Sequence, residues 1–215
     1  LTCGLFKPNG NKMNSTVNFG VKSPMMAMVR GLVLSAAVLG PVAVQAATTP
    51  ALAAVPSVDL ERFQGRWYQI AYYPNQFQKQ CVSGTTADYK RLSTGNIEVI
   101  NNCRKADGSP NNIVGLARIK QIRLLGVPLS QGVTSKLEVR FAPSWLSWVP
   151  GVWAPYWVIQ LADDYRYAVV GEPNREFLWI LSRTPTLAPQ DRAVITTRLQ
   201  QQSYDPSKLQ EEPQP

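Results

Sequence analysis

Residues 65–73 read Gly-Arg-Trp-Tyr-Gln-Ile-Ala-Tyr-Tyr and are followed by Pro74-Asn75. This run is rich in aromatic residues, which favour a pleated, half-buried strand. Proline then ends the run because it has no amide hydrogen to donate to a sheet, and asparagine favours a turn. The stretch therefore predicts a strand with a turn directly behind it.

Seven further segments of the same kind follow before residue 184, with no helical period of useful length between them. Apolar and charged residues alternate cleanly in Ser135–Phe141, as expected for a strand with one buried face. A Ser-Thr-Gly turn signal separates the second and third strands of the set. The seven segments are Thr85–Leu92, Asn96–Asn102, Ile113–Ile122, Ser135–Phe141, Tyr156–Leu161, Arg166–Val170 and Phe177–Ser182.

Eight sequential strands joined mostly by short turns predict an all-β fold, an antiparallel up-and-down barrel that has no exposed edges. A barrel of eight strands is just wide enough to hold one small ligand. A β-sandwich is the alternative that the pattern leaves open. Beyond the strands, Pro189 suits a first helical turn, and Ile195 and Leu199 lie four residues apart. Residues 190–202 therefore predict an amphipathic helix packed outside the barrel.

Residues 25–46 have the layout of a secretory signal peptide. A lone positive charge at Arg30 precedes an uncharged, mostly apolar stretch from Gly31 to Val44, and small residues follow. This stretch is short for a membrane span, which needs about 20 apolar residues. We expect cleavage after Ala46 or Ala53 and export to the periplasm or the outside. No cysteine follows for lipid attachment, so we expect a free carrier and leave outer-membrane association open.

The rest of the chain divides into four parts. Residues 1–24 lack periodicity and precede a cluster of methionines, so we expect them to lie outside the natural protein or to be disordered. Residues 47–57 predict a linker and residues 58–210 one barrel domain. The acidic, proline-bearing residues 211–215 predict a disordered tail.

Composition excludes several functions. The chain carries a formal net charge of +8, but four of its basic residues precede position 47, and the others are scattered. The sequence has no histidine, which removes imidazole base catalysis and the commonest metal ligand. It also has no glycine-rich phosphate loop. We therefore expect a binding protein that is not an enzyme, with no cofactor, metal or nucleic-acid partner.

Two cysteines remain after the predicted signal peptide, Cys81 and Cys103. An even count in an oxidising compartment predicts one disulfide. Two buried thiols are the alternative.

Three motifs resemble those of the lipocalin family. Gly65–Tyr68 resembles the Gly-x-Trp signature that opens lipocalins, Asp163–Tyr167 looks like the second motif, and Leu178–Pro185 looks like the third. The third motif is close to the form found in bacterial outer-membrane lipocalins related to apolipoprotein D. The resemblance covers about Val58 to Leu209. It implies binding, storage or transport of a small apolar ligand, a fatty acid or lysophospholipid, in the bacterial cell envelope, with a homodimer as one expected form.

Strand parity assigns the two ends of the barrel. The start of the first strand and the ends of the second, sixth and eighth strands must lie together, so this end gathers all three motifs. We expect a closed end with a structural role, in which the guanidinium of Arg183 lies across the indole of Trp67. Its residues are Gly65, Trp67, Asp163, Tyr167 and Arg183.

The opposite, open end should hold the ligand. Alternation along the strands predicts an inward-facing pocket set of Ala71, Tyr89, Val99, Leu137, Val139, Phe141, Trp157 and Trp179. The loops expected at this mouth carry Phe77, Trp145, Trp148 and Trp153. For the three loop tryptophans we consider packing on the rim, contact with the ligand, and contact with a membrane or partner.

Two other classes of function stay open at this stage. One is a lipocalin-fold enzyme that acts on a bound apolar ligand through Tyr, Asp or Arg. The other is a protein-interaction module that uses the tryptophan-rich loop. An altered ligand would favour the first, and a barrel filled with side chains would favour the second.

Overall fold

The computed structural model describes residues 49–120, 123–124, 127–128 and 132–215. The predicted signal peptide and the segment before it lie outside these residues. Among the helices of the described part, none has the length and apolar character needed to cross a membrane.

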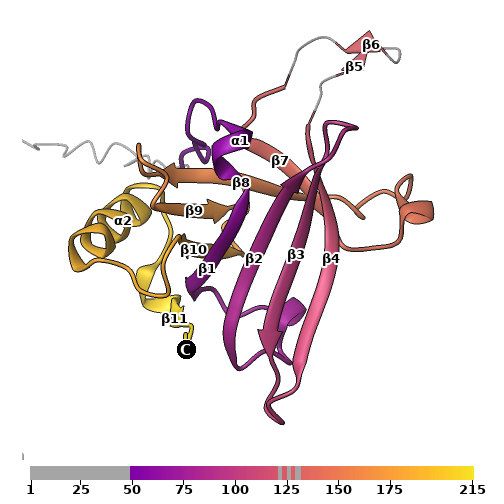
Figure 1. Cartoon of the computed structure of the whole chain (residues 1–215). Helices are drawn as coiled ribbons and strands as arrows, with labels where there is room; N and C mark the ends of the chain where they lie inside the picture. Colours follow the sequence, from indigo (N-terminus) through magenta and orange to yellow (C-terminus); the bar gives the residue numbers. More distant parts are fainter. Residues whose placement is uncertain (1–48, 121–122, 125–126, 129–131) are drawn as a thin grey trace, which may run out of the picture. The chain divides into compact units, whose positions relative to one another are not determined.

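Eight antiparallel strands form a closed barrel, which confirms the predicted fold (Figure 1). Each strand pairs with the next along the chain, and β10 pairs with β1 to complete the closure. Every strand overlaps one predicted segment. The strands are β1 (Gly65–Tyr72), β2 (Ser83–Arg91), β3 (Ile97–Arg104), β4 (Pro110–Ile119), β7 (Lys136–Arg140), β8 (Ala154–Leu161), β9 (Tyr167–Gly171) and β10 (Leu178–Ser182).

Short elements connect and flank the barrel. A two-stranded hairpin, β5 (Arg123–Leu124) and β6 (Val127–Pro128), lies between β4 and β7 and was not predicted. Three single 3-10 turns follow other strands or the long helix. They are η1 (Gln76–Gln78), η2 (Ser144–Leu146) and η3 (Pro206–Lys208).

Helix α2 (Pro189–Gln201) packs on the outer wall of the barrel beside β9 and β10 (Figure 1). Its buried residues Ile195 and Leu199 belong to the outer cluster, an apolar group on the outside of the barrel wall that also includes Ile159 of β8 and Val169 of β9. The predicted helix is therefore confirmed within one residue at each end. A second, four-residue helix, α1 (Leu60–Phe63), precedes β1, and Asp59 caps it by accepting hydrogen bonds from the backbone N–H groups of its first turn.

The C-terminal tail is ordered, so the prediction of disorder for residues 211–215 is wrong. Strand β11 (Gln210–Glu211) pairs with the end of β1. The buried Glu212 carboxylate accepts hydrogen bonds from Gln69 Nε2, Thr85 N and Thr85 Oγ1. The tail fills the space where β1 and β2 separate. Its partners on these strands are distant in the sequence, so the acidic, proline-bearing tail segment alone gives no sign of them.

The predicted linker at 47–57 is also more than a linker in its described part. Leu52 is buried in the outer cluster, and the carbonyl of Pro50 accepts a hydrogen bond from Arg175. Val55 exchanges hydrogen bonds with the barrel, donating its N–H to Val158 and accepting from the Ser135 hydroxyl. Residues 50–57 therefore belong to the folded domain.

Candidate ligand-binding site

Arg183 closes one end of the barrel. Its guanidinium carbon lies 3.8 Å from the centroid of the Trp67 ring, and its nitrogens donate to the carbonyls of Arg62, Gln64 and Arg66. Burial lowers the pKa of Arg183 from its usual value. Gly65 permits the approach of the backbone because its φ is +87°, where other residues are strained. These contacts fit a structural role for the closed end.

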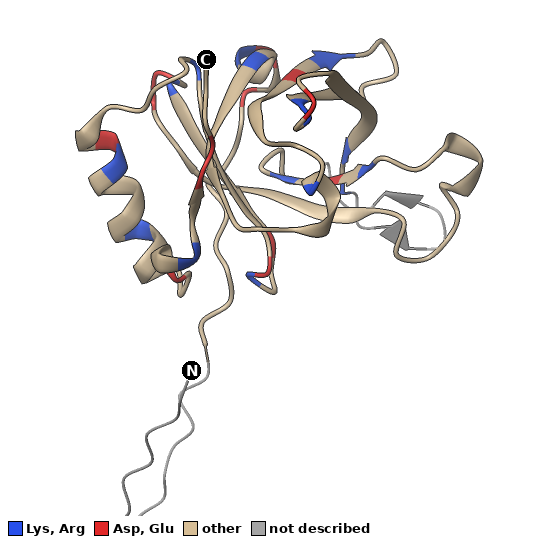
Figure 2. Ribbon diagram, turned by 90° about the horizontal axis from the view of Figure 1, so that it is seen from below, with Lys and Arg blue, Asp and Glu red and all other residues tan. Residues whose placement is uncertain are grey.

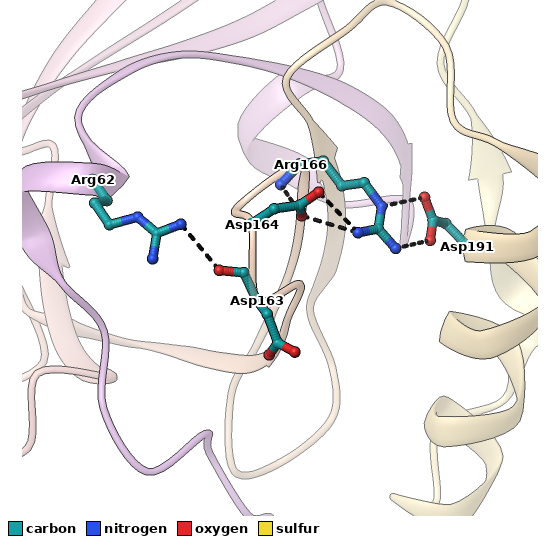
Figure 3. A network of polar contacts seen from close by, with 5 residues as sticks. All are labelled: Arg62, Asp163, Asp164, Arg166 and Asp191. Carbon is teal, nitrogen blue, oxygen red and sulfur yellow. Dashed lines mark hydrogen bonds and ion pairs between the residues drawn. The ribbon is translucent and has the colours of Figure 1, made fainter.

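The second motif forms a turn that ties the barrel to α2 (Figure 3). Asp164 accepts from the Arg166 backbone N–H and guanidinium, and the same guanidinium bonds both carboxylate oxygens of Asp191 on α2. These bonds lower the pKa of Asp164 and Asp191. Asp163 contributes its backbone carbonyl, which accepts from Arg62. The two adjacent aspartates thus cap and fasten a turn.

The exposure of side chains in the barrel interior increases from the closed end to the open end. Trp67 at the closed end is 0% exposed, while Ile113 and Phe141 at the open end are 45% and 37% exposed. Ile113 faces inward because it lies two residues from Gly115, which pairs with the buried Val99. Phe141 lies against Gly115 so closely that a Cβ there would be 2.6 Å from its ring. These exposed apolar side chains mark the upper part of the barrel interior as the candidate ligand site.

Most of the predicted pocket residues face inward. The inner cluster, which is the group of buried apolar residues inside the barrel, contains Tyr89, Val99 and Leu137, with Val139 and Trp179 packed against it. Their part in ligand binding stays a prediction.

Ala71 and Trp157 face outward, so their assignment to the pocket is wrong. A β-bulge between Gln69 and Ala71 shifts the alternation in β1, and Ala71 packs in the outer cluster. A second bulge, between Val158 and Gln160, does the same in β8. Trp157 packs against the outer cluster, with Lys136 Nζ 4.3 Å from its ring centroid. A bulge adds one residue to a strand, which exchanges the two faces beyond it.

Two tyrosines place hydroxyl groups inside this apolar interior, and the sequence reasoning found only one of them. Tyr89 of β2 and Tyr156 of β8 share a hydrogen bond between their hydroxyls. Burial raises the pKa of Tyr89 to about 12 and that of Tyr156 well above its usual value. Tyr156 pairs with Leu137 across the sheet, so correct parity in β8 would have identified it.

The predicted disulfide between Cys81 and Cys103 is present and lies at the open end. Cys81, in the loop after η1, is bonded to Cys103 near the end of β3, and their Cα atoms are 5.5 Å apart. It ties the loop between β1 and β2 to the barrel wall. Phe77 on this loop lies 5.4 Å from the ring of Phe177, which in turn stacks 6.0 Å from Trp179. Phe177, and Gln78 in η1, were not identified from the sequence.

The loop between β7 and β8 projects from the barrel (Figure 1) and places its three tryptophans differently. Trp145 and Trp148 are 70% and 78% exposed. Trp153 instead lies between two guanidinium groups, 3.8 Å from Arg118 and 5.0 Å from Arg140, and its Nε1 donates to the carbonyl of Ser147. Trp153 therefore anchors the loop, and the other two tryptophans are presented to the outside.

Charged side chains do not gather on one element. Figure 2 shows Lys and Arg spread over the ribbon and mixed with Asp and Glu. Within the described residues, no three side chains of the metal-ligating types come together.

A lipocalin-like domain model matches residues 58–214. The chain belongs to the lipocalin family. Temperature-induced lipocalin-1 of Arabidopsis thaliana is 35% identical over 161 residues, which cover 74% of this chain and 81% of the relative. Apolipoprotein D of Mus musculus is 32% identical over 160 residues, covering 70% and 74%. Outer membrane lipoprotein Blc of Escherichia coli is 30% identical over 156 residues, covering 72% and 78%.

A solved structure supports the same fold. Insecticyanin from the tobacco hornworm Manduca sexta superposes with a TM-score of 0.57 at 23% identity, covering 77% of this lipocalin and 85% of that chain. Lipocalins bind small hydrophobic ligands, and they are generally binding proteins, not enzymes.

Proposed function

We propose that this lipocalin binds a single-chain lipid, a fatty acid or a lysophospholipid, in the upper half of its barrel and carries or stores it in the cell envelope. The exposure of Ile113 and Phe141 on the inward face, above a floor sealed by Trp67, is the observation that carries this proposal. An acyl chain entering this interior removes apolar surface from water, which is favourable by about 0.8 kcal/mol per methylene.

The interior chemistry favours a carrier over an enzyme. The two hydroxyls in the inner cluster belong to Tyr89 and Tyr156, and burial raises the pKa of both. They are therefore neutral phenols at pH 7 and poor general bases. Both cysteines of the described part are joined in the disulfide, so neither supplies a thiol nucleophile.

The predicted signal peptide supports export, and similarity to an outer membrane lipoprotein supports a place in the cell envelope. Of the two predicted cleavage sites, we favour the one after Ala46. Cleavage after Ala53 would remove Leu52, which is buried against the barrel, and Pro50, whose carbonyl accepts from Arg175. Homodimer formation stays a prediction.

Mass spectrometry of an organic extract of the purified, folded protein tests the proposal. We expect single-chain lipids in near-stoichiometric amount, and uptake of added fatty acid by delipidated protein. An extract without lipid, together with no uptake of added fatty acid, would contradict the lipid-carrier proposal and favour an interaction module. A chemically changed lipid after incubation would favour the enzyme alternative.

A lipid surface is a second candidate partner, favoured by the loop between β7 and β8. Residues 141–157 contain no charged side chain, and Trp145 and Trp148 are the most exposed large apolar residues of the described part. Tryptophan is favoured at the boundary between water and lipid, where its ring is buried and its N–H remains wet. Contact with a membrane at the open end would let a lipid pass between bilayer and barrel.

A further inference from the structure

The mouth of the barrel contains a buried amide with unused hydrogen-bond donors. Gln78, at the end of η1, has a side-chain nitrogen, Nε2, that is buried and has no hydrogen-bond partner among the described residues. Buried polar atoms are almost always hydrogen-bonded, and an unpaired one calls for an explanation.

The orientation of this amide is determined by its neighbours. The Gln78 side-chain oxygen accepts from Trp179 Nε1 at 3.1 Å and from Asn75 Nδ2 at 3.2 Å. Asn75 is itself fixed, because its oxygen accepts from the Phe77 backbone N–H and its nitrogen also donates to the Tyr73 carbonyl. Turning the Gln78 amide over would set its nitrogen against two donors. Nε2 is therefore the donor that remains free.

Gln78 lies among aromatic side chains at the mouth of the barrel. Trp179 packs against the inner cluster, so the amide bonded to its indole lies on the inner rim of the barrel. Phe177 stacks on Trp179, and Phe77 packs on Phe177. This arrangement places the Gln78 amide beside a row of three aromatic rings at the mouth, above the interior that the acyl chain would occupy.

We propose that Gln78 Nε2 donates hydrogen bonds to an anionic oxygen in the headgroup of the bound single-chain lipid, either a carboxylate or a phosphodiester. This inference rests on the proposed lipid-binding function and adds the group that selects the headgroup. A lipid oriented in this way has its chain directed toward Tyr89 and Tyr156 and its headgroup at the mouth.

The test compares three lipids with the same sixteen-carbon chain: hexadecanoate, hexadecanoyl lysophosphatidylcholine and neutral 1-hexadecanol. Dissociation constants are measured on delipidated protein at pH 8 for wild type, Gln78→Met and Gln78→Glu. Methionine keeps the length of the side chain but has no donor. Glutamate keeps the oxygen that accepts from Trp179 and replaces the donor by a second acceptor.

We expect both variants to bind at least one of the two anionic-oxygen lipids about tenfold more weakly, as expected for the loss of one charge-assisted hydrogen bond. Binding of 1-hexadecanol should change by less than about threefold. A loss confined to hexadecanoate assigns a carboxylate, and a loss confined to the lysophospholipid assigns a phosphodiester. Gln76→Met, an exposed position in the same turn, is the matched control and should bind all three lipids as wild type does.

Two results would overturn the inference while leaving the proposed function intact. One is an equal loss for all three lipids in the Gln78 variants, which would mean that the amide only supports packing. The other is wild-type affinity throughout in variants with a normal thermal melt. Failure of wild-type protein to bind any of the three lipids would instead overturn the proposed function, and the inference with it.

Discussion

Arg183 connects the end of β10 to the start of β1 through one side chain that meets an indole face and three backbone carbonyls. Arg183→Ala should lower the free energy of unfolding by about 1–3 kcal/mol, because the cation–π pair is lost and three carbonyls lose a donor. Ligand affinity of the folded variant should barely change. Chemical denaturation and lipid titration measure the two quantities.

Arg183→Lys is the matched variant for this prediction. Lysine keeps a charge over Trp67 but lacks the planar fork that reaches several carbonyls, so its stability should fall between wild type and the alanine variant. A large loss of ligand affinity with unchanged stability would mean that this end of the barrel is the binding end.

We expect the ion pair of Asp191 with Arg166 to make the stability of the fold sensitive to acid. Its bond to Arg166 lowers the pKa of its carboxyl below the ordinary 3.8. A depressed pKa gives stability that is present above the unfolded-state value and is lost as the pH falls through the folded-state value. The melting temperature of the wild type should therefore fall between about pH 5 and pH 2, and Asp191→Asn should flatten this part of the curve.

The neighbouring Asp164 shares the same guanidinium and contributes in the same direction. Asp163→Asn is the control, because the Asp163 carboxylate makes no hydrogen bond among the described residues and points away from Arg166 in Figure 3. Parallel pH curves for wild type and Asp191→Asn would contradict the assignment.

At the scale of the elements, runs of strand-favouring residues separated by turn signals located all eight barrel strands, and alternation along them then assigned the inward-facing residues. The same rule failed within β1 and β8, where a bulge displaces Ala71 and Trp157 to the outer wall. A bulge depends on the pairing partner, which one segment of sequence does not contain. No sequence signal marks Gln78 either, since its role depends on Trp179, 101 residues away.

The C-terminal tail closes the wall between β1 and β2. Its two adjacent glutamates differ in environment, because Glu212 is buried and Glu211 is exposed. Glu212→Ala should lower the free energy of unfolding by about 1–3 kcal/mol, because the buried donors of Gln69 and Thr85 lose their acceptor. Glu211 is exposed and pairs only with Arg192 on the surface, so Glu211→Ala should change stability little. Denaturation curves compare the two, and equal losses would contradict an ordered, sealing tail.

In the loop between β7 and β8, variants can distinguish the exposed tryptophans, Trp145 and Trp148, from the packed Trp153. Replacing Trp145 and Trp148 by serine should reduce sedimentation of the protein with lipid vesicles and leave the thermal melt unchanged, because both rings are exposed. Trp153→Ser is the contrasting variant and should lower the melting temperature, since it removes the ring between Arg118 and Arg140. Unfolding of the double variant, or unchanged vesicle binding, would count against a lipid surface as partner.

For the whole molecule, three short motifs in order were enough to predict the family and the closed end, because contacts such as that of Arg183 with Trp67 join residues from the two halves of the chain. The identity of the ligand is a different matter. It depends on the few polar groups in an apolar interior, and these come from separate strands and loops. Tyr89 and Tyr156, for example, are 67 residues apart and meet only in the folded barrel.

Dependence of affinity on acyl-chain length tests the central claim most directly. Saturated fatty acids of increasing length are titrated into delipidated protein while tryptophan fluorescence is followed, and a dissociation constant is obtained for each. Because burial of a methylene yields about 0.8 kcal/mol, affinity should rise by up to about fourfold per carbon until the chain outgrows the interior. Affinity that does not depend on chain length would contradict an apolar pocket in the barrel.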